Sequence, residues 1–150
     1  MRAVIQRVSE ASVEIEGEIK GRIGPGFLVL IGIEEGDTEE DVRWLAGKIV
    51  NMRVFGDSQG LMNLDLKAAG GDILLVSQFT LHALVKKGNR PSFIRAARPE
   101  KALPLYGKFI AFAGELLGRK IETGEFGASM RVRLLNDGPV TIFIDTKNKE

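Results

Sequence analysis

The chain has 150 residues with no cysteine, one histidine, and a net charge of +1 that results from 21 basic and 20 acidic side chains. This length suits a single domain over residues 1–150, while the missing cysteines exclude disulfides, thiolate metal sites and cysteine nucleophiles. The single histidine excludes a zinc site built from several histidines, and the balanced charge excludes attraction of nucleic acid over the whole surface, so any RNA has to be recognised locally.

The N-terminal part of the chain predicts strands. Residues 2–8 and 11–17 alternate polar and apolar side chains with a period of two, and Gly17 within residues 16–23 indicates a hairpin to a third strand. Residues 26–33 form an apolar run bounded by glycines, which is typical of a strand covered on both faces. An alternating N-terminus is unlike a signal peptide, and no apolar run approaches the roughly 18 residues of a membrane span. We therefore expect a cytoplasmic protein without a membrane partner.

A first helix is predicted to begin after Thr38. Threonine is a favoured N-cap residue, and the acidic residues that follow it stabilise the positive end of the helix dipole. Beyond this helix, residues 51–55 predict a short strand and residues 72–79 a second buried strand. The apolar residues that recur at helical spacing would form one face of the helix: Val42, Leu45, Ile49 and Met52.

A second helix is predicted over residues 98–118, with Pro99 at its first helical position and Gly118 past its end. Pro104 removes one backbone donor, which predicts either a kink or a late start of this helix. Strands that outnumber two helices favour an α/β domain in which the helices cover one side of a layered sheet.

Two β-type runs, residues 130–135 and 140–145, close the chain, and Asp-Gly within residues 136–139 indicates a plain hairpin between them. Pro139 fits a plain hairpin less well, because it fixes φ and supplies no donor. The Gly138–Pro139 bond can also be cis. A cis bond would turn the two carbonyl groups in an unusual direction, where they could line a pocket without any side chain.

A polar cluster ends the strand predicted over residues 72–79. Ser77, Gln78 and Thr80 could form the floor of a site, and His82 could act as a base for Thr80, because alternate residues of a strand share one face. The simpler interpretation is that these polar side chains only satisfy backbone groups at the end of the strand. His82 by itself is better interpreted as a partly exposed loop residue than as a base.

Residues 86–98 carry basic side chains with no acid among them and hold Phe93 in the middle. Such a segment suits phosphates and an unpaired base, and a solvated loop is an equally good interpretation. Arg131 and Arg133 could extend the same patch. The basic residues of the segment are Lys86, Lys87, Arg90, Arg95 and Arg98.

Phe126 and Met130 lie in residues 123–130, where they are surrounded by small side chains. They could stack on a ring, and they could equally be core residues. No paired carboxylates, glycine-rich phosphate loop or serine-hydrolase motif is present elsewhere, so we expect neither a metal nor a cofactor.

Several short stretches occur in order over nearly the whole chain, and together they closely resemble the D-aminoacyl-tRNA deacylases, first called D-tyrosyl-tRNA deacylases. The resemblance implies an enzyme that hydrolyses the ester between a D-amino acid and the 3′-terminal adenosine of tRNA, and that also removes glycine mischarged onto tRNA. It implies a three-layer β/β/α fold and a homodimer with each site near the subunit interface. The stretches are MRAVIQRV (1–8), MN (62–63), SQFTL (77–81), GNRPSF (88–93), ETGEFGASM (122–130) and NDGPVT (136–141).

The resemblance also implies roles for the residues of the SQFT stretch. Ser77, Gln78 and Thr80 match the family's Ser-Gln-x-Thr motif, with Phe79 as the variable member. The backbone N–H groups of Phe79 and Thr80 would stabilise the oxyanion, and the 2′-hydroxyl of the substrate would orient or activate the attacking water. An alternative makes Thr80 a covalent nucleophile. His82 stands where relatives often have another residue, so it is dropped as a base.

Further residues match other parts of the family pattern. Gly138-Pro139 matches a Gly-cisPro motif that reaches into the partner subunit's site and rejects L-amino acids, and Arg7 matches an arginine that helps to hold that loop. Phe126 and Met130 match residues near the terminal adenosine. The expected contacts with tRNA phosphates come from Lys86, Lys87 and Arg90.

Two alternatives to an enzyme remain open at this point. The chain could be a non-catalytic module that holds the aminoacylated end of tRNA through residues 86–98. It could also be a structural dimer without a ligand.

Overall fold

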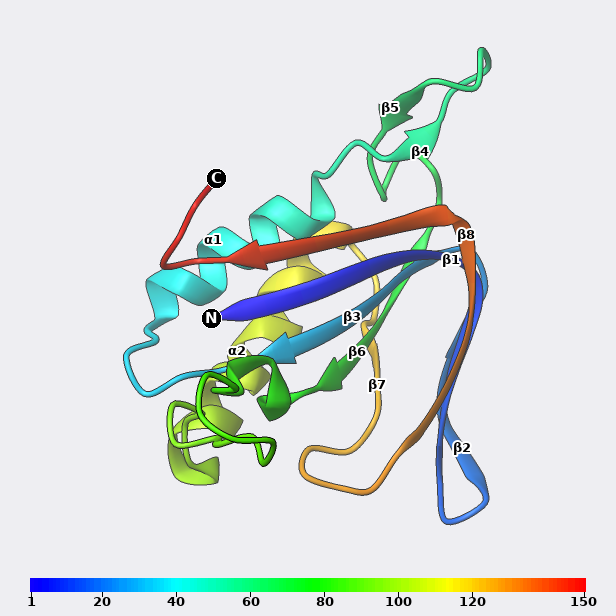
Figure 1. Cartoon of the computed structure of the whole chain (residues 1–150). Helices are drawn as coiled ribbons and strands as arrows, with labels where there is room; N and C mark the ends of the chain where they lie inside the picture. Colours follow the sequence, from blue (N-terminus) through cyan, green and yellow to red (C-terminus); the bar gives the residue numbers. More distant parts are fainter.

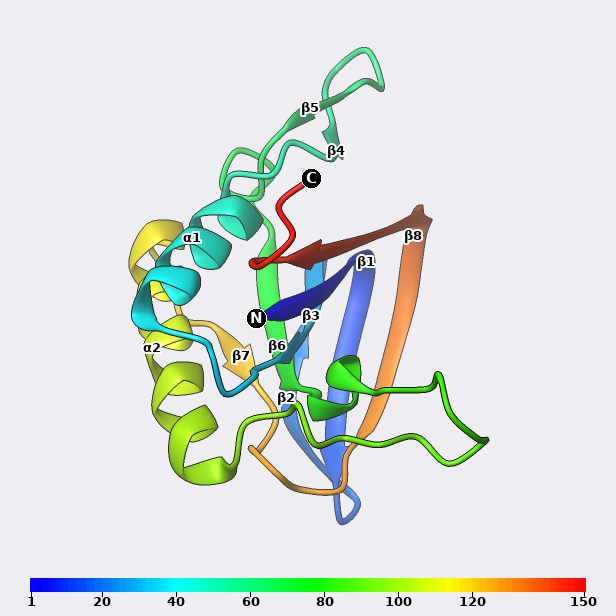
Figure 2. The ribbon, with the colours of Figure 1, turned by 60° about the vertical axis from the view of Figure 1, so that its left-hand side comes forward.

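All residues from Met1 to Glu150 are described by a computed structural model, in which a bent six-stranded sheet carries both α-helices on one face (Figure 1, Figure 2). The path through the sheet is β2-β1-β3-β6-β7, and β8 pairs with β1; β3, β6 and β7 are parallel. The elements are β1 (Arg2–Ile15), β2 (Glu18–Ile23), β3 (Gly26–Gly32), α1 (Glu39–Val50), β4 (Phe55–Gly56), β5 (Met62–Leu64), β6 (Asp72–Ser77), the 3₁₀ turn η1 (Phe79–His82), α2 (Pro99–Leu117), β7 (Glu122–Thr123) and β8 (Arg131–Asp145).

The N-terminal region forms one long strand, β1, where the sequence predicted two. Its first half pairs with β3 and its second half with β2, while β8 runs along its other edge. The predicted hairpin between β1 and β2 is confirmed, and Glu16 and Gly17 both have positive φ there. The gap between the two predicted strands, at Ser9 and Glu10, does not break β1. The register with β8 shifts on either side of Val8, and pairing continues beyond it.

The predicted C-terminal hairpin is wrong. β8 does not reverse direction: Asn136 pairs with Val8 and Thr141 with Gln6, so residues 137–140 stand out as a bulge opposite Arg7. The Asn136 side chain holds the bulge, since its Oδ1 accepts the N–H of Val140 at 2.9 Å. Figure 1 shows the sheet turning sharply at this corner of β8, which is what a bulge does to a strand.

Both faces of the central strands are buried, as the apolar runs predicted. On one face, Phe27 and Ile73 pack with α1 and α2 in a core of 22 buried residues. On the other face, Leu28 and Leu74 join a separate cluster of seven buried residues that includes Val13 of β1. The domain therefore has three layers. The central strands β3 and β6 form the middle layer, the two α-helices cover one face, and the part of the bent sheet that contains β2 and the adjoining halves of β1 and β8 covers the other.

The first helix agrees with its prediction at the start and differs at the end. Thr38 is the N-cap, and its backbone N–H donates to the Asp41 carboxylate at 2.9 Å. The expected face is buried through Ile49, but Met52 lies beyond the last residue of α1 and is not part of that face. The strand predicted over 51–55 is only the two-residue β4, which begins at Phe55.

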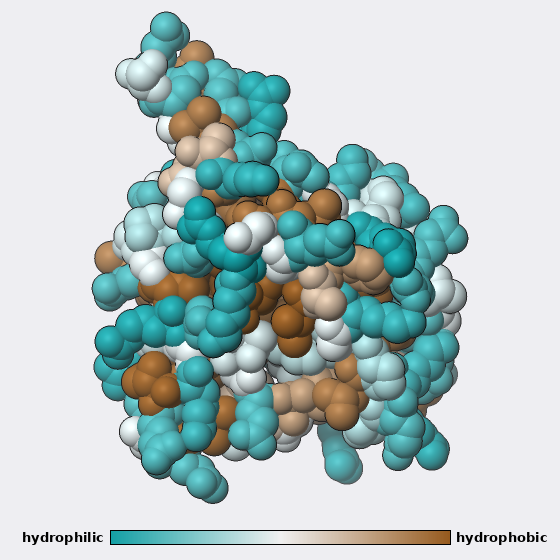
Figure 3. All heavy atoms as spheres, turned by 180° about the vertical axis from the view of Figure 1, so that it is seen from behind, coloured by the Kyte–Doolittle hydropathy of each residue, from teal (hydrophilic) through white to brown (hydrophobic).

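The second helix begins at Pro99, so the late start suggested by Pro104 is wrong. The donor that Pro104 lacks would have reached the carbonyl of Glu100 in the first turn, so only one hydrogen bond near the helix end is lost. Six buried residues hold α2 in place, and Gly118 ends it with φ of 75°. Neither α-helix combines the length and apolar character needed to cross a bilayer. Figure 3 shows that apolar residues on the helix-bearing side form separate patches between polar ones.

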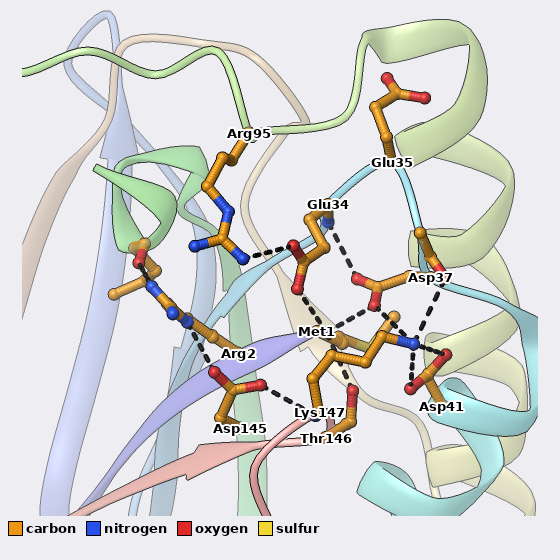
Figure 4. A network of polar contacts seen from close by, with 12 residues as sticks. Met1, Arg2, Glu34, Glu35, Asp37, Asp41, Arg95, Asp145, Thr146 and Lys147 are labelled. Carbon is orange, nitrogen blue, oxygen red and sulfur yellow. Dashed lines mark hydrogen bonds and ion pairs between the residues drawn. The ribbon is translucent and has the colours of Figure 1, made fainter. Parts of the chain in front are cut away.

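A polar network joins the N-terminal amine to the start of α1 and the end of the chain (Figure 4). The Met1 amine is completely buried and lies 2.5 Å from Asp37 Oδ1 and 2.9 Å from Thr146 Oγ1. Lys147 Nζ donates to Asp41 Oδ2 at 2.8 Å. Burial disfavours ionisation of Asp41, but hydrogen bonds from Lys147, Thr146 and the Thr38 backbone outweigh it and hold its pKa well below the ordinary value.

We expect this network to make the protein sensitive to acid. A carboxylate whose pKa is lowered in the folded state stabilises the fold above its ordinary pKa, and that contribution is lost progressively as the pH falls from about 5 towards the lowered pKa. The free energy of unfolding, measured by urea titration at stepped pH, should fall more steeply in the wild type than in Asp41→Asn. The surface variant Asp65→Asn should keep the wild-type slope, and equal slopes for the wild type and Asp41→Asn would contradict this assignment.

Candidate active site

A cavity of about 310 Å³ lies at the carboxyl ends of the parallel strands β3 and β6. Ligands of open α/β sheets commonly bind at this edge. Two larger and more open hollows, of about 910 and 790 Å³, lie between α1 and the end of β8 and over the strands β1, β2 and β8. We consider the smaller one the candidate site because apolar walls meet the polar SQFT motif only there. Its lining residues are Ile31, Ile33, Ser77, Gln78, Phe79, Ala96, Ala97, Pro99, Ala102, Phe126 and Gly127.

The SQFT motif forms one wall of this cavity. β6 ends at Ser77, and the Gln78 N–H donates to the Ile31 carbonyl at 2.7 Å before the chain enters η1. The strand therefore stops two residues earlier than predicted. Gln78 Nε2 donates to Thr80 Oγ1 at 2.5 Å, so Thr80 is tied to the wall although it does not line the cavity itself.

His82 is neither a partly exposed loop residue nor on a strand face shared with Thr80, so both expectations are wrong. The residue ends η1 with 0% of its surface exposed, and neither ring nitrogen has a hydrogen-bond partner. Burial lowers its pKa. The ring fits there because Gly32 has no side chain: a Cβ at Gly32 would lie 3.0 Å from His82 Cδ2.

The structure separates the two residues expected near adenosine. Phe126 lines the cavity and packs against Tyr106, with ring centroids 5.5 Å apart. Met130 is not a lining residue; it packs against the cluster around Val13 and lies over Gly124. Of these two residues, Phe126 alone lies where it could stack on a ring bound in the cavity.

The basic segment lies at the rim of the site. Backbone bonds between Leu84 and Ser92, at 2.8 and 3.0 Å, close an exposed loop. Phe93 then meets Phe79 edge to face, with centroids 5.1 Å apart. The loop carries Lys86, Lys87 and Arg90, all of them exposed.

Of the other two basic residues in the segment, only Arg95 is paired: it lies 3.3 Å from Glu34. The backbone N–H of Arg98 donates to Glu35, but its side chain is exposed and has no ion pair. Both acids come from the loop after β3, so the fold neutralises one of the five positive charges of the segment. The others remain available to attract an anionic ligand.

The Gly138-Pro139 segment forms the β8 bulge, and its peptide bond is cis, as expected. Arg7 Nε donates to the Asp137 carbonyl at 2.9 Å, and its Nη1 donates to the Val54 carbonyl at 2.5 Å. The bulge occupies the corner of the sheet far from η1, the green turn after β6 in Figure 1, and does not line the cavity. Within one chain, the SQFT motif and the Gly138-Pro139 segment, which the prediction combines in one site, are therefore separated.

A family model described as D-Tyr-tRNA(Tyr) deacylase matches residues 4–145. The chain belongs to the D-Tyr-tRNA(Tyr) deacylase family. D-aminoacyl-tRNA deacylases of Akkermansia muciniphila and Bacteroides thetaiotaomicron are 61% and 60% identical to it over the full length of both sequences. The family suggested by the ordered motifs is thus confirmed, and the chain is an enzyme of the deacylase class.

Two solved structures share the fold of this deacylase. One is named c-Myc DNA Unwinding Element Binding Protein; it has a TM-score of 0.92, is 41% identical, and covers 97% of this chain and 98% of its own. The other is described as a probable eukaryotic D-amino acid tRNA deacylase, with a TM-score of 0.80, coverage of 95% and 97%, and 19% identity, which supports the fold alone.

The deacylase cavity contains no acid–base side chain. None of its eleven lining residues is acidic or basic, and no group of three His, Asp or Glu side chains could hold a metal ion. What the cavity does offer is the start of η1, where the first backbone N–H groups have no partner within the turn. Such groups can stabilise an oxyanion without titrating.

Sequence reasoning missed the wall opposite the SQFT motif. Ala96, Ala97 and Ala102 come from the entry to α2, and Ile31 and Ile33 from the end of β3. The only sequence signal for this wall was the pair of small residues, Ala96 and Ala97, before Pro99 at the first position of α2. That signal was too weak to predict the wall, because packing rather than local sequence sets the distance between α2 and β6.

Proposed function

We propose that the chain hydrolyses the ester that joins a D-amino acid, or a mischarged glycine, to the 3′-terminal adenosine of tRNA, and releases free amino acid and tRNA. The observation that carries this proposal is the cavity at the SQFT motif in a chain that matches curated deacylases over its full length. Its volume of about 310 Å³ is at the lower end of the range for small-molecule sites. That size suits one nucleoside end rather than a folded RNA.

In the proposed complex, the adenine ring stacks on Phe126 in the apolar part of the cavity. RNA-binding proteins commonly bind unpaired bases on aromatic side chains in this way. The ester then lies at the start of η1, where the N–H groups of Phe79 and Thr80 donate to the oxyanion as it forms. Ser77 and Gln78 line the path between ring and ester.

We propose that the substrate supplies the group that activates water. The 2′-hydroxyl of the terminal ribose is next to the ester and has a high effective concentration there. The absence of any titratable lining residue supports this route. The covalent alternative would need a base for Thr80, yet its hydroxyl accepts from Gln78, and the one histidine has no hydrogen-bond contact with it. Neither a metal nor a cofactor is needed.

Chiral selection in this proposal comes from the Gly138-Pro139 segment of a second subunit. Main-chain carbonyls next to the α-carbon of the substrate would collide with an L side chain and leave room for hydrogen, which is rejection by steric conflict. D side chains of many sizes would then point outward. Arg7 supports this role because it holds the bulge through Asp137.

A homodimer through β8 would complete the site. The strand has 15 residues and a hydrogen-bonded neighbour, β1, on one edge only, which leaves the other edge open to a second copy. Large apolar side chains on β8 are exposed: Leu134, Leu135 and Phe143. The scattered patches of the helix side offer a poorer surface for pairing (Figure 3).

The loop that carries Lys86, Lys87 and Arg90 is proposed to contact phosphates of the acceptor end. The contact of Phe93 with Phe79 and the exposure of all three cations support this proposal, because the loop is attached to the rim of the cavity. A substrate of this kind places the reaction in the cytoplasm, where translation occurs.

A nucleic-acid-binding role that does not use the cavity is the second candidate. It is favoured by the exposed basic loop and by the name of the 41%-identical structure, which describes a DNA-binding protein. Binding through this loop would depend strongly on salt and would not require the cavity.

Hydrolysis of matched D-tyrosyl-, L-tyrosyl- and glycyl-tRNA tests the proposal. At protein concentrations far below that of the substrate, we expect multiple turnovers on D-tyrosyl- and glycyl-tRNA and little on L-tyrosyl-tRNA. Tight binding of all three without release of amino acid would establish the binding module instead. Absence of both binding and hydrolysis would favour a purely structural dimer.

A further inference from the structure

The proposed catalytic turn has little support of its own. η1 has only four residues, and its flanking backbone bonds are Leu81 N–H to Gln78 O at 3.3 Å and Ala83 N–H to Thr80 O at 3.1 Å. Hydrogen-bond geometry in 3₁₀ turns is poor, so such a turn does not hold its position by itself. Contacts from outside must place the N–H groups of Phe79 and Thr80.

Arg2 supplies one such contact (Figure 4). Its Nη1 donates to the Leu81 carbonyl at 2.9 Å, and its Nε donates to Asp145 Oδ2 at 2.8 Å. The Asp145 side chain is only 11% exposed, and that of Arg2 25% exposed. One planar guanidinium thus joins the middle of η1 to the end of β8, and bonds that involve a charged partner are stronger than neutral ones.

The position of Arg2 is itself fixed by the sheet. Its backbone pairs with Asp145 on one side and with Gly32 on the other. Gly32 is where η1 rests on the sheet: a Cβ there would lie 2.9 Å from the Gln78 carbonyl oxygen and 3.1 Å from Leu81 Cβ. Asp145, Arg2 and Gly32 are therefore neighbours across three adjacent strands. Gly32 provides the surface on which η1 packs, and Arg2, held by Asp145, hydrogen-bonds to it.

We propose that Arg2 is a positioning residue for ester hydrolysis: through the Leu81 carbonyl it holds η1 so that the Phe79 and Thr80 N–H groups point at the oxyanion. This inference rests on the proposed function. Arg2 does not line the cavity and makes no contact with the reacting atoms. Its loss lowers the rate because a displacement of about 1 Å at a reacting centre can cost on the order of 100-fold in rate.

The experiment compares Arg2→Gln and Arg2→Lys with the control Arg43→Gln in the full-length protein. Arg43 also pairs with a carboxylate, Glu39 Oε1 at 2.8 Å, but it lies on α1 away from the turn. Two quantities are measured for each protein: kcat and KM on D-tyrosyl-tRNA, and hydrogen exchange at the Leu81 and Ala83 amides in the free protein.

We expect Arg2→Gln to lower kcat about tenfold or more with KM changed less than about twofold, because the lost contact matters in the transition state. Exchange at both amides should accelerate about tenfold or more, while thermal stability falls no more than in the control. Arg2→Lys should recover part of kcat, since lysine can still donate to one partner.

The outcomes separate this inference from the proposed function. If the wild type does not hydrolyse D-tyrosyl-tRNA, the proposed function is wrong, and the exchange data still show whether Arg2 holds the turn. If the wild type is active and Arg2→Gln keeps its kcat, the positioning role is overturned. A lower kcat with unchanged exchange at Leu81 and Ala83 overturns it as well, because the turn would not have moved.

Discussion

A D-aminoacyl-tRNA that ends in 2′-deoxyadenosine should be hydrolysed about 100-fold more slowly than the normal substrate, because an intramolecular hydroxyl contributes a large effective concentration. Thr80→Ala should stay within about tenfold of the wild type on the normal substrate, since it removes only the hydrogen bond from Gln78 to Thr80, worth about 1 kcal/mol. Single-turnover kinetics with both RNAs and both proteins measure the two effects.

The four combinations distinguish the two mechanisms. RNA-assisted hydrolysis predicts that the deoxy substrate is slow for both proteins, while the covalent route predicts that Thr80→Ala is inactive on both substrates. Ser77→Ala serves as a control for removal of a neighbouring hydroxyl from the cavity wall. An inactive Thr80→Ala protein with a normal unfolding transition would rule out the proposed route.

Arg7→Gln should reduce the preference for D- over L-substrates about tenfold or more, because hydrogen bonds from a charged donor contribute roughly 1.5–3 kcal/mol. The guanidinium of Arg7 holds the β8 bulge through Asp137 and connects it to Val54. Without it, the carbonyls of the bulge would lose the fixed position from which they are proposed to exclude an L side chain. The ratio of kcat/KM values for D- and L-tyrosyl-tRNA measures the change.

Arg53→Gln is the matched control for this prediction. Arg53 also donates to a backbone carbonyl, that of Asn63 at 2.6 Å, but it supports the β4–β5 hairpin instead of the bulge. We expect its D/L ratio to equal that of the wild type. If Arg7→Gln remains folded, has the oligomeric state of the wild type and keeps the wild-type ratio, main-chain exclusion by the bulge is not the basis of selection.

The buried strands and both helices could be predicted from local pattern. Apolar runs over β3 and β6 indicated burial on both faces, and Thr38, Pro99 and Gly118 marked helix ends by their capping chemistry. These signals work because hydrogen bonding within a helix and alternation along a strand involve residues close together in sequence. The family motifs were likewise readable as short ordered strings.

Predictions failed where a distant segment determined the outcome. The Asp-Gly-Pro stretch looked like a hairpin, but the whole of β8 pairs with β1, and the extra residues form a bulge held by Arg7. His82 looked exposed, but the missing side chain of Gly32 opened a buried site for its ring. Neither outcome could be inferred from the neighbouring residues.

The amino-acid sequence by itself determined the family, the starts of both helices and the candidate site residues, because each depends on residue types at short spacing. Only the tertiary structure decided where those residues meet. It placed the SQFT motif beside Phe126 and the entry to α2, separated it from the Gly138-Pro139 bulge, and put Arg2 against η1. The physical reason is that packing and sheet register join segments distant in sequence, such as Arg2 and Leu81 at a separation of 79 residues, for which local pattern contains no signal.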